Sequence, residues 1–327
     1  MRKTISTALF FVLICFSAVL SADLEVKPDQ NMIKVGEQGS WRQTREGIAI
    51  YTSAKGFDAV SSIPDLDPGS GDNKISLKFK NADIRDLIRM IQKMSGFNIV
   101  VCKGVMGQIE QVQLTDVDWP VALASLAYSK GYAARIRNGI IFIGDAKKLE
   151  WMFSQSDNNA PTDGDLISIS FKDTAIVDVL KVVTARTKRN IVIEKSTVGH
   201  LTVSLHDVSE TAAVTALVRT NGFDCLYHDS VWFIGSPLLI ETLRQQNLAK
   251  DVQFNGGDIS MDFRDTDIRA IFNIIAKQSK MKLSVTDNVQ GNITVKLTDM
   301  PSEKAASYIA WGNGYDIEFT TDGIQIK

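Results

Sequence analysis

One alternation of apolar and polar residues occurs three times along the chain. At its first occurrence Ile75, Leu77 and Phe79 alternate with polar residues, which predicts a strand with one buried face. The pattern returns 92 residues later and again 92 residues after that, at Ile167, Ile169 and Phe171 and then at Ile259, Met261 and Phe263. A constant period of this length indicates tandem copies of one folded unit.

Each alternating segment is followed by the pattern of an amphipathic helix. Apolar residues recur three and four positions apart, so they fall on one side of a helix that must pack against its own unit. This stripe consists of Ile84, Leu87, Ile88 and Ile91 in the first copy, Ile176, Val179, Leu180 and Val183 in the second, and Ile268, Ile271, Phe272 and Ile275 in the third.

The remainder of each copy predicts two strands, a second helix and a closing hairpin. The third strand starts at one shared glycine and the second helix ends at another; these are Gly107, Gly199 and Gly291, and then Gly131, Gly222 and Gly314. The predicted fold class is α+β, with three tandem small β-α-β-β-α-β-β domains joined by short linkers. A unit of about 70 residues buries only roughly 60% of its unfolded surface, so we expect the copies to stabilise one another by stacking or by contact with other chains.

The repeat divides the chain into seven segments. The segment before the first copy is the hardest to interpret, because Gly47 lies 92 residues before Gly139 of the first hairpin. It is either the tail of a degraded fourth copy or an unrelated hairpin and linker. The predicted segments are 1–22 (signal peptide), 23–73 (N-terminal hairpin and linker), 74–145 (first domain), 146–165 (linker), 166–236 (second domain), 237–257 (linker) and 258–327 (third domain).

The first residues have the pattern of a secretory signal. Arg2 and Lys3 precede an uncharged apolar run over 8–20, and the small residues Ser21 and Ala22 follow. The run is shorter than the roughly 20 apolar residues of a membrane span, although an uncleaved anchor is the alternative. We therefore expect export to the periplasm and no integral membrane span after signal cleavage, with association to the outer membrane through partners.

The charge balance argues against polyanionic partners such as nucleic acids and acidic membranes. The chain has 36 Lys and Arg residues against 38 Asp and Glu residues, a net charge of −2. Nucleic-acid and acidic-membrane binding draw on a surplus of basic residues, so neither is expected. Hydrophobic residues make up 44% of the chain, enough to offset the entropy of folding, so most of the chain is expected to be ordered.

Several segments together resemble a known family. The first copy contains a strand followed by an ADIRDLI helix, an NIVV strand, a DVDWPVAL helix start and a hairpin that reads KGY and then NGIIFI. This combination resembles the secretin and TonB N-terminal short domain, above all the periplasmic N-domains of type IV pilus and type II secretion secretins. The second copy lacks the Trp-Pro pair and the third reads DMPSEKAASYI, but both fit the pattern.

The resemblance implies a periplasmic interaction module. In secretins such domains form stacked rings or dock inner-membrane partners and substrates, and in TonB-dependent transducers they pass a signal to a regulator. The matching pattern covers roughly 74–327, and the sequence given has no β-barrel-forming region after Lys327. The resemblance therefore implies the binding role of the family without its pore.

The residues that carry chemistry do not form a recognisable reactive site in the sequence. His200 and His206 would lie on one strand about 20 Å apart, too far to share a zinc ion, and His228 is predicted on the surface with them. Cys225 is predicted in the core and Cys102 on the surface, so no disulfide is expected between them. We expect no metal, no cofactor and no enzymatic activity.

Aromatic residues supply the candidate interaction sites. Trp151 lies in the first linker, Trp232 is predicted on the outward face of the last strand of the second copy, and Trp311 lies on the second helix of the third copy. Tryptophans are enriched at the centres of protein interfaces. The alternative is that they pack between neighbouring copies.

The function expected from these patterns is that of a non-enzymatic periplasmic scaffold or docking protein of a secretin-type machine, in type II secretion or a type IV pilus. Its partners would be proteins of the bacterial envelope, with a secretin and a second copy of this chain as candidates. One alternative is a periplasmic signalling module that docks a TonB-type receptor or regulator domain. Another is a binder of cell-envelope glycans.

Overall fold

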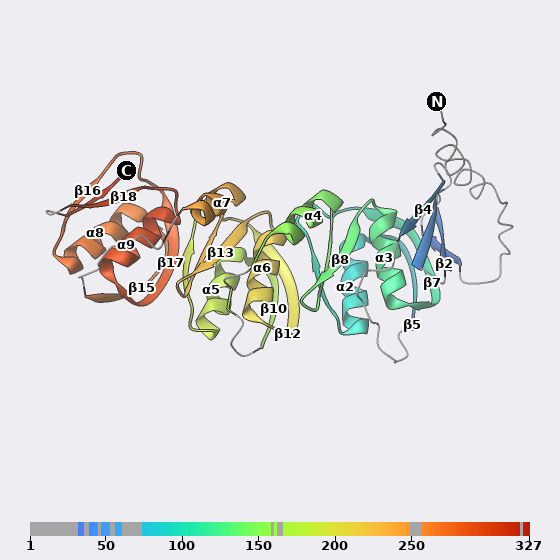
Figure 1. Cartoon of the computed structure of the whole chain (residues 1–327). Helices are drawn as coiled ribbons and strands as arrows, with labels where there is room; N and C mark the ends of the chain where they lie inside the picture. The colour runs from blue at the N-terminus through green and yellow to red at the C-terminus, as the bar shows by residue number, and fades with distance from the viewer. Residues whose placement is uncertain are drawn as a thin grey trace, which may run out of the picture.

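Figure 1 shows three similar units in a row, with a small sheet at the N-terminal end. The computed structural model describes residues 74–157, 160–161, 166–246, 248, 257–320 and 323–327, and the backbone of four strands between residues 32 and 60. The predicted signal peptide at 1–22 lies outside the described residues. Among the helices that are described, none combines the length and apolar character needed to cross a membrane.

Each unit has the predicted order of elements, so the α+β fold class is confirmed. The first contains β5 (Lys74–Asp83), α2 (Ile84–Ser95), β6 (Asn98–Val101), β7 (Gln108–Asp118), α3 (Trp119–Ser129), β8 (Ala133–Arg137) and β9 (Ile140–Gly144). The second contains β10 (Ile167–Ala175), α5 (Ile176–Arg186), β11 (Asn190–Ile193), β12 (His200–Val208), α6 (Glu210–Thr220), β13 (Asp224–His228) and β14 (Val231–Gly235). The third contains β15 (Asp258–Asp267), α8 (Ile268–Ser279), β16 (Lys282–Val285), β17 (Asn292–Pro301), α9 (Ser302–Trp311), β18 (Ile317–Thr320) and β19 (Gly323–Ile326).

Two short helices lie in the connections between units. They are α4 (Ala146–Ser154) and α7 (Pro237–Gln245), and the side chains of Asp145 and Ser236 cap their N-termini. We propose the predicted residue limits, 74–145, 166–236 and 258–327, as the boundaries of the three domains.

Within each unit, the long first strand pairs with the strand that precedes the second helix, and the three short strands form a separate ladder. In the first unit β5 pairs antiparallel with β7, while β9 lies between the parallel β6 and the antiparallel β8. The apolar stripe predicted for the first helix is buried in all three units. The strand pair, the three-stranded ladder and the two helices of a unit therefore enclose one core.

The units stack by joining the edge of one to the edge of the next. The short strand β11 of the second unit pairs antiparallel with β17 of the third, so strands from both units form one sheet in the order β13-β14-β11-β17-β15. Asn190 at the start of β11 extends this pairing, because its Oδ1 accepts from the backbone N–H of Thr298 at 2.8 Å and its Nδ2 donates to the Thr298 carbonyl.

The same asparagine contact occurs between the first and second units. Asn98, at the start of β6, accepts from the backbone N–H of His206 at 2.8 Å and donates to the His206 carbonyl at 2.9 Å. Asn98 and Asn190 are 92 residues apart, so the contact repeats with the period of the sequence. A side-chain amide that imitates a backbone amide fixes the register between neighbouring units.

The outer faces of the first two three-stranded ladders pack on the second helix of the following unit. The Phe233 ring of β14 meets the Tyr308 ring of α9 edge to face, with centroids 5.2 Å apart. Gly312, just after α9, gives room for this contact, because a Cβ there would lie 2.6 Å from Cγ1 of Val192. Phe233 and Val192 lie on strands of the second unit but belong to the core of the third.

The four N-terminal strands form an antiparallel meander that continues the sheet of the first unit. They are β1 (Met32–Val35), β2 (Gly39–Thr44), β3 (Gly47–Thr52) and β4 (Gly56–Val60), and β1 pairs antiparallel with β7. The order β4-β3-β2-β1-β7-β5 differs from that of a unit, in which the last strand of the hairpin lies next to the first short strand.

The repeated asparagine contact leads to a stability prediction. Asn98→Ala and Asn190→Ala should each lower the free energy of unfolding by about 1 kcal/mol, because each removes two hydrogen bonds whose backbone partners can still reach water. Urea denaturation measures this loss. The Asp variants keep the acceptor oxygen but place a second carboxylate oxygen against the backbone carbonyl that the amide Nδ2 faced, so they should not recover the loss; Asp variants as stable as the parent would contradict the assigned geometry.

Candidate interaction surfaces

Each contact between neighbouring units joins two kinds of face, one outgoing and one receiving. The outgoing face is the outer side and free edge of the three-stranded ladder, represented in the second unit by Asn190, Val192 and Phe233. The receiving face is the free edge of the strand before the second helix together with the outer side of that helix, represented in the third unit by Val295 and Tyr308. In the described part of the chain, the outgoing face of the third unit is covered by no further unit.

The outgoing face of the third unit is polar where the other two are apolar. The parallel ladders align the faces residue by residue, since β6 with β9, β11 with β14 and β16 with β19 have matching registers. The aligned sets are Asn98, Val100 and Phe142; Asn190, Val192 and Phe233; and Lys282, Ser284 and Gln325. Lys282 and Ser284 are exposed, as are Glu318 and Thr320 on β18 of the same ladder. A polar outer face is the property expected of a terminal repeat.

Trp232 lies in the core, so its predicted outward orientation is wrong. Its side chain is 1% exposed, and its Nε1 donates to Oε1 of Glu210 on α6 at 2.8 Å. The prediction failed because every residue of Val231–Gly235 is buried: Trp232 faces its own helices, while Val231 and Phe233 face the next unit. A strand buried on both sides carries no alternation that distinguishes its faces.

The structure does not bring the three tryptophans together. Trp151 is partly buried on α4, and Trp311 is partly buried on α9 beside Tyr308, with ring centroids 5.9 Å apart. Figure 1 shows α4 and α9 in different parts of the row. An interaction role for Trp151 and Trp311 stays a prediction, and Trp232 offers no accessible ring.

Both cysteines of the described residues are buried and unpaired. The prediction is confirmed for Cys225 and wrong for Cys102, which is 1% exposed. Helix α4 covers Cys102, whose Sγ lies 3.8 Å from Sδ of Met152. Burial raises the pKa of the Cys102 thiol to about 11, while the nearby Lys148 ammonium lowers it. Burial likewise raises the pKa of Cys225 to about 12. Neither thiol is a reactive nucleophile near neutral pH.

No metal centre is visible among the side chains that the structure describes. His200 and His206 are exposed on β12 and His228 is partly buried on β13. No group of three or more His, Cys, Asp or Glu side chains in these parts of the chain is arranged to hold an ion.

A buried charge network, which sequence reasoning missed, ties both linkers to the second unit. Arg219 and Asp224 are 2% and 1% exposed and pair at 2.8 Å. Asp157 of the first linker contacts Arg219 at 2.8 Å, and Arg244 of α7 contacts Asp224 at 2.8 Å. The available signal was that Arg219 aligns with Tyr128 and Trp311, so a charge stands at an aromatic position of the helix.

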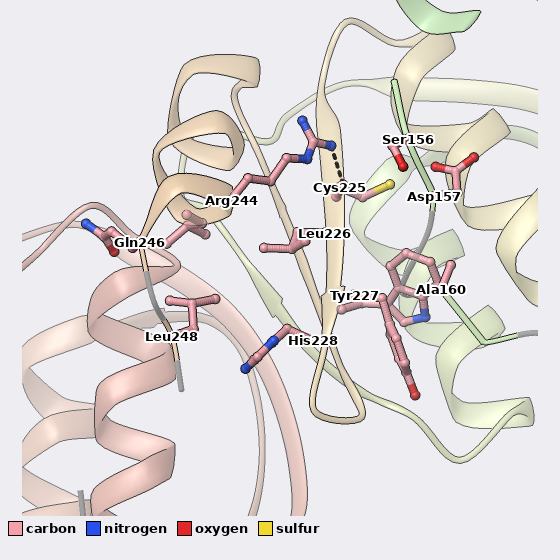
Figure 2. Close-up of a pocket in the computed structure, with 12 residues that line it drawn as sticks. Ser156, Asp157, Ala160, Cys225, Leu226, Tyr227, His228, Arg244, Gln246 and Leu248 are labelled. Carbon is pink, nitrogen blue, oxygen red and sulfur yellow. Dashed lines mark hydrogen bonds between the residues drawn. The ribbon is translucent and has the colours of Figure 1, made fainter. Parts of the chain in front are cut away.

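Figure 2 shows the hollow beside this network, with a volume of about 370 Å³. It lies against β13, between residues of the two linkers. Tyr227 lies on one side of the strand, and His228 projects from the other side toward Leu248. Trp232 also lines the hollow. Asp157 and Arg244 reach the hollow but are held in ion pairs. The described residues that line the hollow offer packing surface, and none of them forms a pair set for acid–base chemistry.

Comparison with known proteins gives a partial likeness. No protein-family profile matches the chain. A stretch of 64 residues is 38% identical to the type IV pilus biogenesis and competence protein PilQ of Neisseria gonorrhoeae, covering 20% of this chain and 9% of that protein. A stretch of 63 residues is 33% identical to the fimbrial assembly protein PilQ of Pseudomonas aeruginosa, covering 19% of this chain and 9% of the relative.

The chain resembles the N-terminal domains of secretins. Among solved structures, the N-terminal domain of the secretin XcpQ from Pseudomonas aeruginosa is 14% identical, over 71% of this chain and 95% of that one, with a TM-score of 0.20. A score this low carries no argument of its own. The chain spans less than a tenth of the curated PilQ relatives, 9% of each. Their activity as whole proteins is therefore not transferred.

The buried position of Trp232 predicts a structural role. Trp232→Ala should lower the free energy of unfolding by about 3–5 kcal/mol, because it opens a cavity and leaves Glu210 without its hydrogen bond. Trp311→Ala removes a partly exposed ring and should cost less. Chemical denaturation of both variants measures the difference, and a Trp232→Ala protein as stable as the parent would contradict the assignment.

The raised thiol pKa values predict a loss of stability at high pH. In the unfolded chain a thiol ionises near the ordinary value of 9.0, whereas folded Cys102 keeps its proton to about 11. The contribution to stability is therefore present below pH 9 and lost as the pH rises from about 9 to 11, where the unfolded chain binds fewer protons. Denaturation from pH 8 to 11 should show a shallower decline for Cys102→Ala than for the parent.

The same burial predicts slow chemistry at the thiols. At pH 8 a thiol reagent should leave both cysteines of the folded protein unmodified and react with both after denaturation. Rapid labelling of the folded protein at Cys102 would show that α4 does not cover it.

Proposed function

We propose that the protein is a non-enzymatic docking component of a secretin-type machine, in type II secretion or a type IV pilus, and that it acts in the periplasm through protein–protein contacts. The observation that carries the proposal is the stack itself: the first and second units each use a strand edge and an apolar sheet face to bind the unit that follows. The 38% identity of one stretch to a pilus biogenesis protein supports the machine context.

The contact between the second and third units illustrates the proposed mode of binding. Backbone pairing of β11 with β17 supplies hydrogen bonds that do not depend on side chains. Phe233 and Tyr308 add an apolar contact, and the pairs Arg264–Asp178 at 2.6 Å and Lys181–Asp262 add charge at the rim. A partner that presents an extended edge can use the same type of contact.

The two alternatives receive less support from the described residues. A glycan binder needs an accessible aromatic platform, and Trp232 is 1% exposed. A signalling module that docks a TonB-type receptor or regulator needs the same surfaces as a scaffold, so the two roles differ in the identity of the partner. Partner identification therefore separates them.

In vivo photo-crosslinking tests the proposal in a cell that makes the full chain. Photoreactive residues at Ser284 and Glu318 probe the polar outgoing face, and one at Gln245 on α7 provides an exposed control. We expect adducts from the first two positions that mass spectrometry assigns to a secretin or another component of its machine, with a weaker signal from the third.

Other outcomes overturn the proposal. Adducts with a TonB-type receptor or a membrane regulator would establish the signalling alternative, and glycan adducts would establish the glycan binder. A monomer with no adduct above the Gln245 control would exclude a docking role for this face.

A further inference from the structure

The N-terminal sheet contacts the first unit where a preceding unit would. Val112 on β7 and Val295 on β17 are equivalent, because they lie opposite Phe79 and Phe263 in matching ladders. On the opposite edge of β17, Val295 pairs with Val192 of the preceding unit. Val112 pairs in the same antiparallel manner with Val35 of β1. Strand β1 therefore occupies on the first unit the position that β11 occupies on the third.

The second helix of the first unit is buried on its outer side, as expected of a receiving face that another element covers. Helix α3 is apolar on nearly every side, and its buried residues run without interruption from Val121 to Ala127. In the third unit the outer side of the equivalent helix packs through Tyr308 against the preceding sheet, and the position equivalent to Tyr308 in α3 is Ser125, which is 0% exposed. Strands β1 and β2 lie against α3, and Figure 1 shows the meander beside it.

We propose that the meander β1–β4 is a stand-in for a preceding unit and closes the stack at its N-terminal end. Two observations support this role: the register of β1 on β7, and the apolar helix α3 against which β1 and β2 lie. Without it, the receiving face of the first unit would fit a three-stranded ladder with an antiparallel edge and an apolar outer face, such as those of the first and second units. This inference does not depend on the proposed docking function.

Engineered disulfides test the register directly. In a background with Cys102→Ala and Cys225→Ala, the pair Val35→Cys and Val112→Cys places two thiols directly opposite each other in an antiparallel ladder, within reach of a disulfide. The pair Val192→Cys and Val295→Cys is the matched positive control, because it has the same register position. Val35→Cys with Val203→Cys, the equivalent edge of the second unit, is the negative control.

We expect the 35–112 pair to oxidise within one chain about as fully as the 192–295 pair, and the 35–203 pair to remain reduced, as read from peptide mapping under non-reducing conditions. A 192–295 disulfide without a 35–112 disulfide would overturn the proposal. So would an equal yield from 35–203, because the meander would then have no preferred edge.

Hydrogen exchange gives a second readout in the full chain. Val35→Pro removes a backbone donor from β1 and should speed exchange in α3 by roughly tenfold or more, with α9 unchanged as an internal reference for folding. Ala59→Pro on the far strand β4 should leave α3 protected. Unchanged α3 protection in the Val35→Pro protein would show that the meander does not cover this helix.

Discussion

The pairing of one unit's edge strand with the next unit is the contact on which the architecture depends. A unit of about 70 residues buries a modest share of its surface and leaves an unpaired strand edge, which is a template for unwanted association. The strand β11 removes both problems at once, since its edge pairs with β17 while Val192 and Phe233 enter the next core. The chain is therefore a stack in which one unit contributes residues to the core of the next.

The linkers set the geometry of this stack through buried charge. Asp157 and Arg244 come from different linkers and meet on the Arg219–Asp224 pair of the second unit. Desolvation makes such a network a weak source of net stability, but removing one member would leave a buried charge without its partner. The network therefore contributes specificity. Helix α7 and Asp157 can approach the second unit in one arrangement that pairs every charge.

The repeat and the order of elements could be predicted because they follow from local periodicity that recurs three times. The orientation of Trp232 and the burial of Cys102 could not be predicted, because both depend on neighbours outside the unit. Trp232 lies in a strand that is apolar on both sides, and Cys102 is covered by α4, which local patterns place in a linker. The ion pair of Arg219 could not be predicted either, because its partner Asp157 lies in the segment predicted as the first linker.

The two ends of the stack differ in how they resist growth. At one end the face has the side chains of a solvated surface, with Lys282 and Ser284 where the inner units have Asn and Val. At the other end the receiving face keeps its apolar helix and is covered by a meander from the same chain. Polar substitution at the third unit excludes a further unit of the same apolar kind, because no rearrangement restores the apolar contact, but it leaves the face open to a partner with polar contacts. A tethered sheet covers a face by mass action, with an effective concentration that a partner must exceed. Competition with the tethered sheet therefore controls access at the first unit, whereas the polar face of the third unit is accessible without displacement.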